Sequence, residues 1–121
     1  MITSDERGSV TIVAAGAIVI VLVCTMGVAD VGRVLTERSR AETSADAAAL
    51  AAAQDLALDT GDPEADAASY AVRNGAELVS CSCAAGSFEA VVEVRRVFDG
   101  LLLLPGSHAI TSRARAVVDV P

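Results

Sequence analysis

The feature that most constrains this chain is a long apolar run near its start. The segment from Val10 to Ala29 contains no charged residue. As a helix rising about 1.5 Å per residue, it would be about 30 Å long, which matches the hydrocarbon core of a bilayer. The rest of the chain is too short to surround a helix that is apolar on every side. The run therefore predicts a membrane span rather than a buried core helix.

The helical pattern continues beyond the apolar run without interruption. The sequence is rich in alanine, which has the highest helix propensity, and it contains no proline before Pro63. Small apolar residues recur at helical spacing and form one stripe, made of Val34, Ala41, Ala45, Ala48 and Ala52. We therefore predict a single helix over residues 9–58, in which residues 10–29 span the membrane and the remainder is amphipathic.

The charged residues exclude one class of function and support the helix. The chain has nine basic residues, all of them arginine, against 16 acidic ones, and its net charge is −7. Since only 2% of its residues are aromatic and it has no basic stripe, nucleic-acid binding is excluded. Arg33–Glu37 and Arg38–Glu42 have the spacing of helical ion pairs. We expect both pairs on the solvated side, where each contributes about 0.3 kcal/mol.

The sequence after residue 58 predicts a turn and a second helix. Gly61 and Pro63 mark the turn, and Gly75 is typical of a helix C-terminus, so we place the helix at residues 63–74. Four acidic residues surround the turn: Asp59, Asp62, Glu64 and Asp66. Their spacing does not match a calcium-binding EF-hand. Because acidic residues are favourable in the first turn of a helix, a capped and solvated turn is the preferred interpretation.

Three later segments alternate between apolar and polar residues, which predicts a three-stranded antiparallel sheet with one buried face. The side chains expected inside are Val79, Cys81, Cys83, Phe88, Ala90, Val92, Val94, Ile110, Ala114, Ala116 and Val118. Those expected outside are Glu89, Glu93, Arg95, Arg113, Arg115 and Asp119. Between the last two segments, residues 99–107 form a turn with four consecutive leucines. We interpret it as a hydrophobic flap over the core in preference to a docking surface.

No pattern in the chain indicates catalysis. There is one histidine, His108, and neither a Ser-His-Asp or Cys-His arrangement nor a glycine-rich phosphate-binding loop can be identified. Glu89 and Glu93 lie near arginines on one strand face, which is typical of a solvated sheet surface. The three cysteines and the histidine lack the spacing of a zinc site. We therefore expect no enzyme activity, no metal and no cofactor.

Cys81 and Cys83 are two residues apart, and three interpretations of them are open. They are small buried side chains, or they are bonded to each other after export, or they cross-link to a partner. The first is preferred, because an extended strand holds residues i and i+2 too far apart for a relaxed disulfide. The third cysteine, Cys24, lies inside the apolar run.

Three stretches carry a resemblance to a known family. They are the N-terminal RGSVTIVAAG, the sequence DVGR at residues 30–33 and the sequence ADAAALAAA at residues 45–53. In this order and spacing, residues 7–57 resemble the TadE/TadG-like proteins of Flp (Tad) pilus assembly systems. The shorter C-terminal part most resembles the small actinobacterial TadE-like proteins that are encoded near secretion genes.

The resemblance implies a pilin-like α+β protein whose N-terminal helix enters the membrane and packs with other subunits. It implies that residues 1–8 are a leader, that a prepilin peptidase cuts between Gly8 and Ser9, and that residues 59–121 form a small exported domain. The implied partners are membrane lipid, other pilin-like subunits and Tad-type assembly proteins. The helix positions that would carry assembly are Val13, Gly16, Gly27, Asp30, Gly32, Arg33, Asp46 and Leu50.

Two features of the chain bear on this implied role. Pilins of this kind usually carry a glutamate at the fifth mature position, where this chain, counted from Ser9, has Val13. A minor, capping or base component, or one that is never packed into a filament, therefore fits better than a repeating major subunit. One arginine precedes the span and three follow it closely, so the basic residues alone would place the C-terminal side in the cytoplasm. The resemblance implies the opposite orientation, which we adopt.

Other functions are compatible with the sequence. A secreted binding module with a signal peptide would be cut before Asp30, although the apolar run is longer than the usual signal of about 7 to 15 apolar residues. A lipoprotein anchored at Cys24 is disfavoured, because Val23 replaces the small residue expected before the cysteine. A permanently anchored accessory protein would keep its N-terminus and hold another protein through the glycine and alanine faces of the helix.

Overall fold

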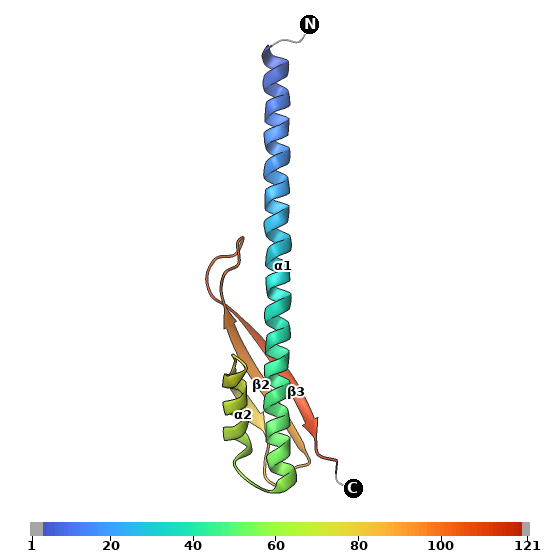
Figure 1. The fold of residues 1–121 in the computed structure, drawn as a ribbon, viewed down its shortest axis with the longest axis vertical. Helices are drawn as coiled ribbons and strands as arrows, with labels where there is room; N and C mark the ends of the chain where they lie inside the picture. The colour runs from blue at the N-terminus through green and yellow to red at the C-terminus, as the bar shows by residue number, and fades with distance from the viewer. Residues whose placement is uncertain (1–3, 120–121) are drawn as a thin grey trace.

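The chain forms one very long helix with a small domain at its C-terminal half (Figure 1). The computed structural model describes residues 4–119, and side chains from residue 7. The helices are α1 (Ser4–Leu58) and α2 (Pro63–Arg73), and the strands are β1 (Glu77–Ser82), β2 (Glu89–Phe98) and β3 (His108–Val117). The predicted α+β class and the order of the elements are confirmed.

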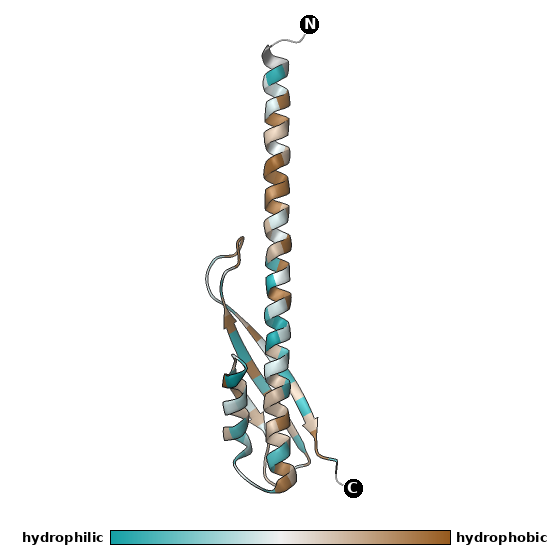
Figure 2. Ribbon diagram, in the orientation of Figure 1, coloured by the Kyte–Doolittle hydropathy of each residue, from teal (hydrophilic) through white to brown (hydrophobic). Residues whose placement is uncertain are grey.

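The first half of α1 projects away from the domain as a single rod (Figure 1). Its most apolar 18-residue window has a mean hydropathy of 2.7, and none of that window is buried. Figure 2 shows this hydrophobic stretch in the upper part of the helix and a more mixed pattern below it. By length and composition the stretch can cross a membrane.

The second half of α1 packs on one face of the sheet, whose order is β1-β2-β3 with both pairs antiparallel. β2 and β3 pair over their whole length, from Glu89 opposite Val117 to Phe98 opposite His108. The buried core is built mainly of alanine. From α1 it contains Ala45, Ala48, Ala49, Ala52 and Ala53, from α2 Ala67 and Ala71, and from the sheet Ala90, Val92, Val94 and Ala114. Such small side chains allow the helices and the sheet to approach closely.

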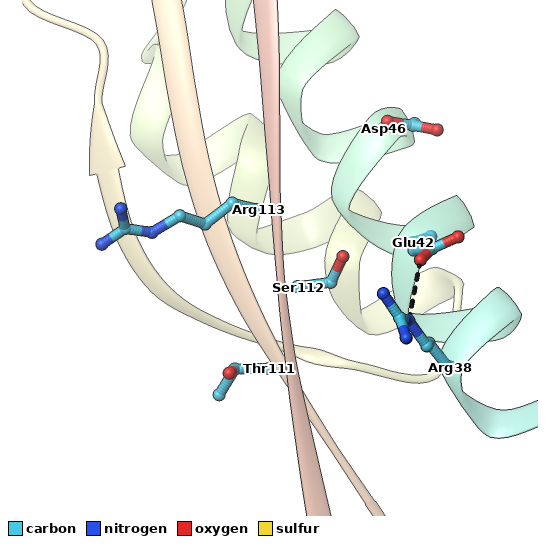
Figure 3. Close-up of a pocket in the computed structure, with 6 residues that line it drawn as sticks. All are labelled: Arg38, Glu42, Asp46, Thr111, Ser112 and Arg113. Atoms are coloured by element: carbon cyan, nitrogen blue, oxygen red, sulfur yellow. Dashed lines mark hydrogen bonds and ion pairs between the residues drawn. The ribbon is translucent and has the colours of Figure 1, made fainter. Parts of the chain in front are cut away.

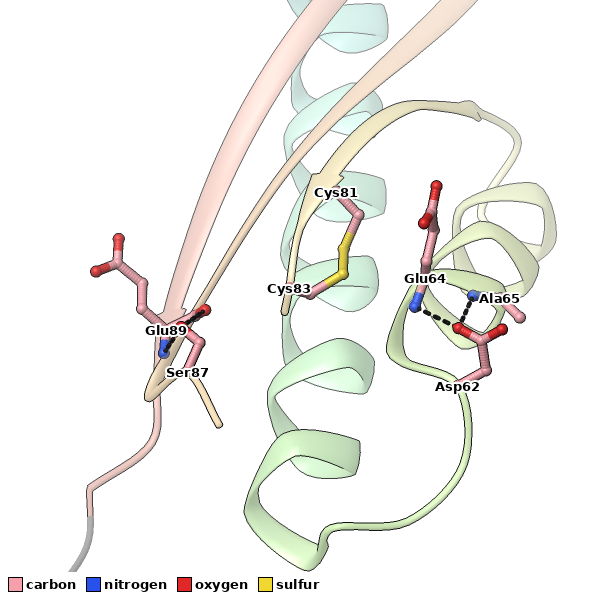
Figure 4. Close-up of a disulfide and its surroundings, with 7 residues drawn as sticks. All are labelled: Asp62, Glu64, Ala65, Cys81, Cys83, Ser87 and Glu89. Carbon is pink, nitrogen blue, oxygen red and sulfur yellow. Dashed lines mark hydrogen bonds between the residues drawn. A yellow bond between two sulfur atoms is a disulfide. The ribbon is translucent and has the colours of Figure 1, made fainter. Parts of the chain in front are cut away.

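The second helix begins and ends as the sequence predicts. The Asp62 carboxylate accepts hydrogen bonds from the backbone N–H groups of Glu64 (3.2 Å) and Ala65 (3.3 Å), which caps the helix, as Figure 4 shows. Asn74 is the C-cap residue, and Gly75 follows with φ of +80°. The acidic turn is therefore a helix cap, in agreement with the preferred interpretation.

Two of the side chains predicted to point into the core do not do so. Val79 is exposed because β1 has a bulge between Leu78 and Ser80, which shifts the alternation by one residue. Leu78 and Cys81 consequently occupy the inner face. Phe88, which immediately precedes β2, is exposed as well. The alternation is confirmed for Ala90, Val92 and Val94 and, more partially, for the inner residues of β3.

Candidate functional site

The exposed apolar half of α1 presents small-residue faces on which another helix could pack. A Cβ placed at Gly16 would meet no other heavy atom within 4 Å, and the same holds for Gly8 and Gly32. Val13, one of the predicted assembly positions, is also exposed. Glycine faces of this kind let helix backbones approach closely in a membrane.

Gly27 and Asp30, at the end of the apolar run, contact the loop that carries the four leucines. The two carboxylate oxygens of Asp30 accept hydrogen bonds from the backbone N–H groups of Leu102 (2.6 Å) and Leu103 (2.8 Å). The loop is therefore fastened to α1 and does not form a flap over the core. Of the four leucines in this loop, only Leu101 is buried. The preferred sequence interpretation is wrong here because Asp30 holds the loop against the helix, beyond the end of the sheet.

Below this contact, Glu37 is fully buried and surrounded by three arginines. Its carboxylate pairs with Arg33 (3.5 Å) and Arg40 (3.3 Å) on α1 and is hydrogen-bonded by Arg96 from β2. The predicted Arg33–Glu37 pair exists, but the expectation that it is solvated is wrong, because the sheet covers Glu37. The hydrogen bond from Arg96 and the three positive charges lower the pKa of Glu37, although burial opposes this shift.

Arg96 connects three elements of the domain. Besides Glu37 of α1, its guanidinium donates a hydrogen bond of 2.7 Å to the carbonyl oxygen of Gly75, in the turn between α2 and β1. A second buried polar contact joins the helices, since the Ser44 hydroxyl donates to the Ala71 carbonyl at 3.2 Å. These contacts fix the rotation of α1 about its axis relative to the small domain, and with it the direction in which the exposed apolar half presents its faces.

The remaining predicted assembly residues, Asp46 and Leu50, lie on exposed parts of α1. Asp46 lines a polar pocket of about 450 Å³ between α1 and β3. Figure 3 shows that Arg38 in this pocket is paired with Glu42, at 3.2 Å, and that Arg113 extends away from them. Leu50 borders a separate shallow groove beside Val117 and Val118. In the polar pocket the carboxylate of Glu42 is paired with Arg38, and the groove beside Leu50 is lined mainly by apolar side chains.

Cys81 and Cys83 are joined by a disulfide beside the start of α2 (Figure 4). Their Cα atoms are 5.5 Å apart, which is within the usual range for disulfides. This spacing is possible because β1 ends at Ser82, so Cys83 is not held in an extended strand. The preference for two separate thiols rested on a continuous strand, which the structure does not have. Both residues are half-buried against the core.

Carboxyl groups, which carry like charges, lie close together where α1 ends. The carboxyl of Asp66 in α2 is next to that of Asp55 in α1. A hydrogen bond between these two carboxyls raises the pKa of Asp55, and burial and the charge of Asp62 raise it further. Gly61 lies directly beside this carboxyl, because a Cβ there would be 3.1 Å from Asp55 Oδ2. The carboxylates therefore oppose each other at the turn between the helices.

The predicted processing residues, Gly8 and Ser9, are exposed in the first turns of α1. The backbone N–H groups of the first turn of a helix lack intrahelical partners, and helix ends fray readily. A peptidase could bind this segment after local unwinding without disturbing the domain. Whether the peptide bond between Gly8 and Ser9 is cut stays a prediction.

Two functional contacts were missed in the sequence. Arg96 continues the inward alternation of Val92 and Val94, so it places an arginine on the buried face, where a charge needs a partner. That signal pointed to a buried acid on another element, which is Glu37. The bonding of Asp30 to the leucine-containing loop had no local signal, because the two segments are more than 70 residues apart.

Residues 8–55, which comprise most of α1, match a protein family described as putative Flp pilus-assembly TadE/G-like. The resemblance read from the sequence is thus confirmed for this segment. No curated protein and no solved structure matches the chain. The match ends before α2 and the sheet, so the narrower likeness to actinobacterial proteins stays a prediction.

Proposed function

We propose that this TadE/G-like chain is a minor pilin-like component of a Tad pilus or a related secretion apparatus. The observation that carries the proposal is the continuity of α1, in which an exposed apolar half passes directly into the half that forms the domain core. A helix of this kind holds a small domain at a fixed distance and angle from the membrane. It can also pack laterally against the helices of other subunits.

The minor role is supported by the residue at position 13. A glutamate at this position of the membrane span would be energetically unfavourable in lipid. It would need a partner, such as the α-amino group of a neighbouring subunit. Val13 is apolar and exposed, so it needs no such partner. The chain can reside in the bilayer alone and join an assembly through its glycine faces.

Export of the small domain is part of the proposal. A disulfide between Cys81 and Cys83 is compatible with an oxidising compartment and is rare in a reducing cytoplasm. The proposed partners are membrane lipid, other pilin-like subunits, Tad-type assembly proteins and a prepilin peptidase that cuts between Gly8 and Ser9.

The intact mass of the native protein, from membranes and from sheared surface material, tests the proposal. A chain that starts at Ser9 and occurs in sheared material is the expected result. Gly8→Leu should block cleavage while leaving the domain folded, and Gly16→Leu is the matched control that should be cut normally.

Two other masses would overturn the proposal. A chain that starts near Asp30 would make the apolar run a signal peptide and the protein a secreted module. An uncut chain found only in membranes would make it a permanently anchored accessory protein, and the assignment of Gly8 and Ser9 would then be wrong.

A further inference from the structure

The loop between β2 and β3 has a composition that is unusual for an exposed loop. Residues 100–107 carry no charge and include four leucines. Leu101 is buried, whereas Leu102, Leu103 and Leu104 are 54%, 44% and 61% exposed. Water-exposed surfaces rarely gather three large apolar side chains in sequence, and such a patch usually marks a contact with a membrane or a protein. We call residues 99–107 the leucine loop.

The leucine loop lies at the height where the apolar run of α1 ends. A Cβ at Gly27 would be 3.7 Å from Cδ1 of Leu103, and Gly27 lies inside the uncharged run. Figure 1 shows the loop rising beside α1 toward the N-terminus, beyond the end of the sheet. Figure 2 shows apolar residues in this loop next to the apolar part of α1.

The loop is held at this height by specific contacts. Asp30 accepts hydrogen bonds from two backbone N–H groups of the loop, which satisfies the carboxylate that lies just past the apolar run. At the other end of the loop, a ring nitrogen of His108 is 2.8 Å from the Leu104 carbonyl oxygen. The backbone near the tip is therefore hydrogen-bonded. The side chains of Leu102 and Leu104 are mostly exposed, whereas Leu103 extends along α1 beside Gly27 and is less exposed.

We propose that the leucine loop inserts Leu102, Leu103 and Leu104 into the interface of the same membrane that α1 crosses. The inference rests on the proposed membrane span at residues 10–29. Lipid is the occupant because the leucines are continuous with the lipid-facing surface of α1 and lie at the level of its last apolar residues. The span and the loop together give two points of attachment, which fix both the tilt and the rotation of the small domain at the membrane surface.

Tryptophan fluorescence tests this directly, because the natural chain contains no tryptophan. Three single-tryptophan variants of the full chain, Leu104→Trp, Val19→Trp and Val72→Trp, are reconstituted into phosphatidylcholine–phosphatidylglycerol vesicles with brominated acyl chains. We expect the emission of Leu104→Trp to be blue-shifted and quenched, more strongly by bromine near the headgroup than by bromine near the bilayer centre. Val72→Trp, on the exposed side of α2, should remain unquenched.

The Val19→Trp variant separates failure of the loop proposal from failure of the membrane span. If Val19→Trp is quenched and Leu104→Trp is not, the span is correct and the loop proposal is overturned. A blue-shifted but unquenched Leu104→Trp would assign the loop to a protein contact instead of lipid. If Val19→Trp is unquenched, both proposals fail. Asp30→Ala in the Leu104→Trp background should reduce the quenching at least twofold, because it releases the loop from α1.

Discussion

The two halves of α1 use apolar residues in opposite ways. Between residues 10 and 29 the helix carries many branched valines and isoleucines, and they are exposed. Between residues 41 and 53 it is mostly alanine, and most of those alanines are buried. Small side chains suit the second half because they let a helix, a sheet and α2 approach closely. The large exposed side chains of the first half are unfavourable in water, which is why we propose that this half lies in lipid. Burial, rather than hydrophobicity, therefore separates the domain core from the proposed membrane segment.

The largest expected effect comes from Glu37, which lies between the two halves. Glu37→Gln leaves Arg96 without a carboxylate partner on the buried side of the sheet, so we expect the free energy of unfolding to fall by about 3 kcal/mol. The measurement is urea unfolding of the full chain in mild detergent, followed by the fluorescence of Tyr70. Glu42→Gln, which removes an exposed pair with Arg38, should change stability by less than about 0.5 kcal/mol. Equal effects of the two variants would contradict the role of Glu37.

The same residue predicts a dependence of stability on pH. Because the pKa of Glu37 is lowered in the folded protein, its contribution is present above its ordinary value of 4.5 and is lost as the pH falls through the lowered value. The difference in stability between the natural chain and Glu37→Gln should therefore shrink in acid. A difference that stays constant down to about pH 2 would show that Glu37 acts through packing alone.

Ala48→Leu tests the claim that the second half of α1 needs small residues. Ala48 is completely buried in the alanine core, so the added carbons would force α1 away from its neighbours. We expect a loss of about 1–3 kcal/mol in the same unfolding experiment. Ala57→Leu introduces the same change at an exposed position of the helix and should be nearly neutral. If both variants are neutral, the close approach of α1 to the domain is not required.

Gly75→Ala tests the turn to which Arg96 is bonded. A Cβ at Gly75 would overlap the Arg96 guanidinium, and the residue has a positive φ that alanine rarely adopts. We expect a loss of about 1–2 kcal/mol. Gly86→Ala has a similar φ but open space around the added carbon, so the difference between the two variants isolates the clash with Arg96. Identical losses would show that backbone strain alone is responsible.

The smallest effect is expected at Asp55, near the C-terminal end of α1. Its contribution to stability depends on pH in the opposite direction to that of Glu37. Asp55 has a raised pKa, so stability falls as the pH rises from its ordinary value of 3.8 through the raised value and the carboxyl ionises beside Asp66. Asp55→Asn should therefore raise the Tm at about pH 7 and have little effect at about pH 3. Asp59→Asn, at an exposed position nearby, should leave the Tm unchanged at both pH values. A lower Tm for Asp55→Asn at neutral pH would contradict this account.

The order of the elements could be predicted because each has a local pattern: an uncharged run, an alanine stripe, a capped turn and alternating strands. The bulge at Leu78–Ser80 could not, because it depends on the pairing of β1 with β2. The sequence alternation already places Arg96 on the same strand face as Val92 and Val94. Its partner Glu37, however, lies 59 residues away in the chain. The position of the leucine loop depends on Asp30, which is separated from it by a still longer stretch. Long-range polar contacts therefore account for most of what the sequence did not reveal.

The central claim is that the first half of α1 lies in lipid while the second half lies in a folded domain. Cys24 tests it most directly, because it is a free, exposed cysteine inside the apolar run, and the other two cysteines form a disulfide. Intact membranes are treated with a membrane-impermeant maleimide, before or after denaturation in SDS without reductant, and the intact mass of the protein is measured by mass spectrometry. We predict no adduct before denaturation and one adduct after it. An adduct in intact membranes, or a mature protein that lacks Cys24, would contradict the account.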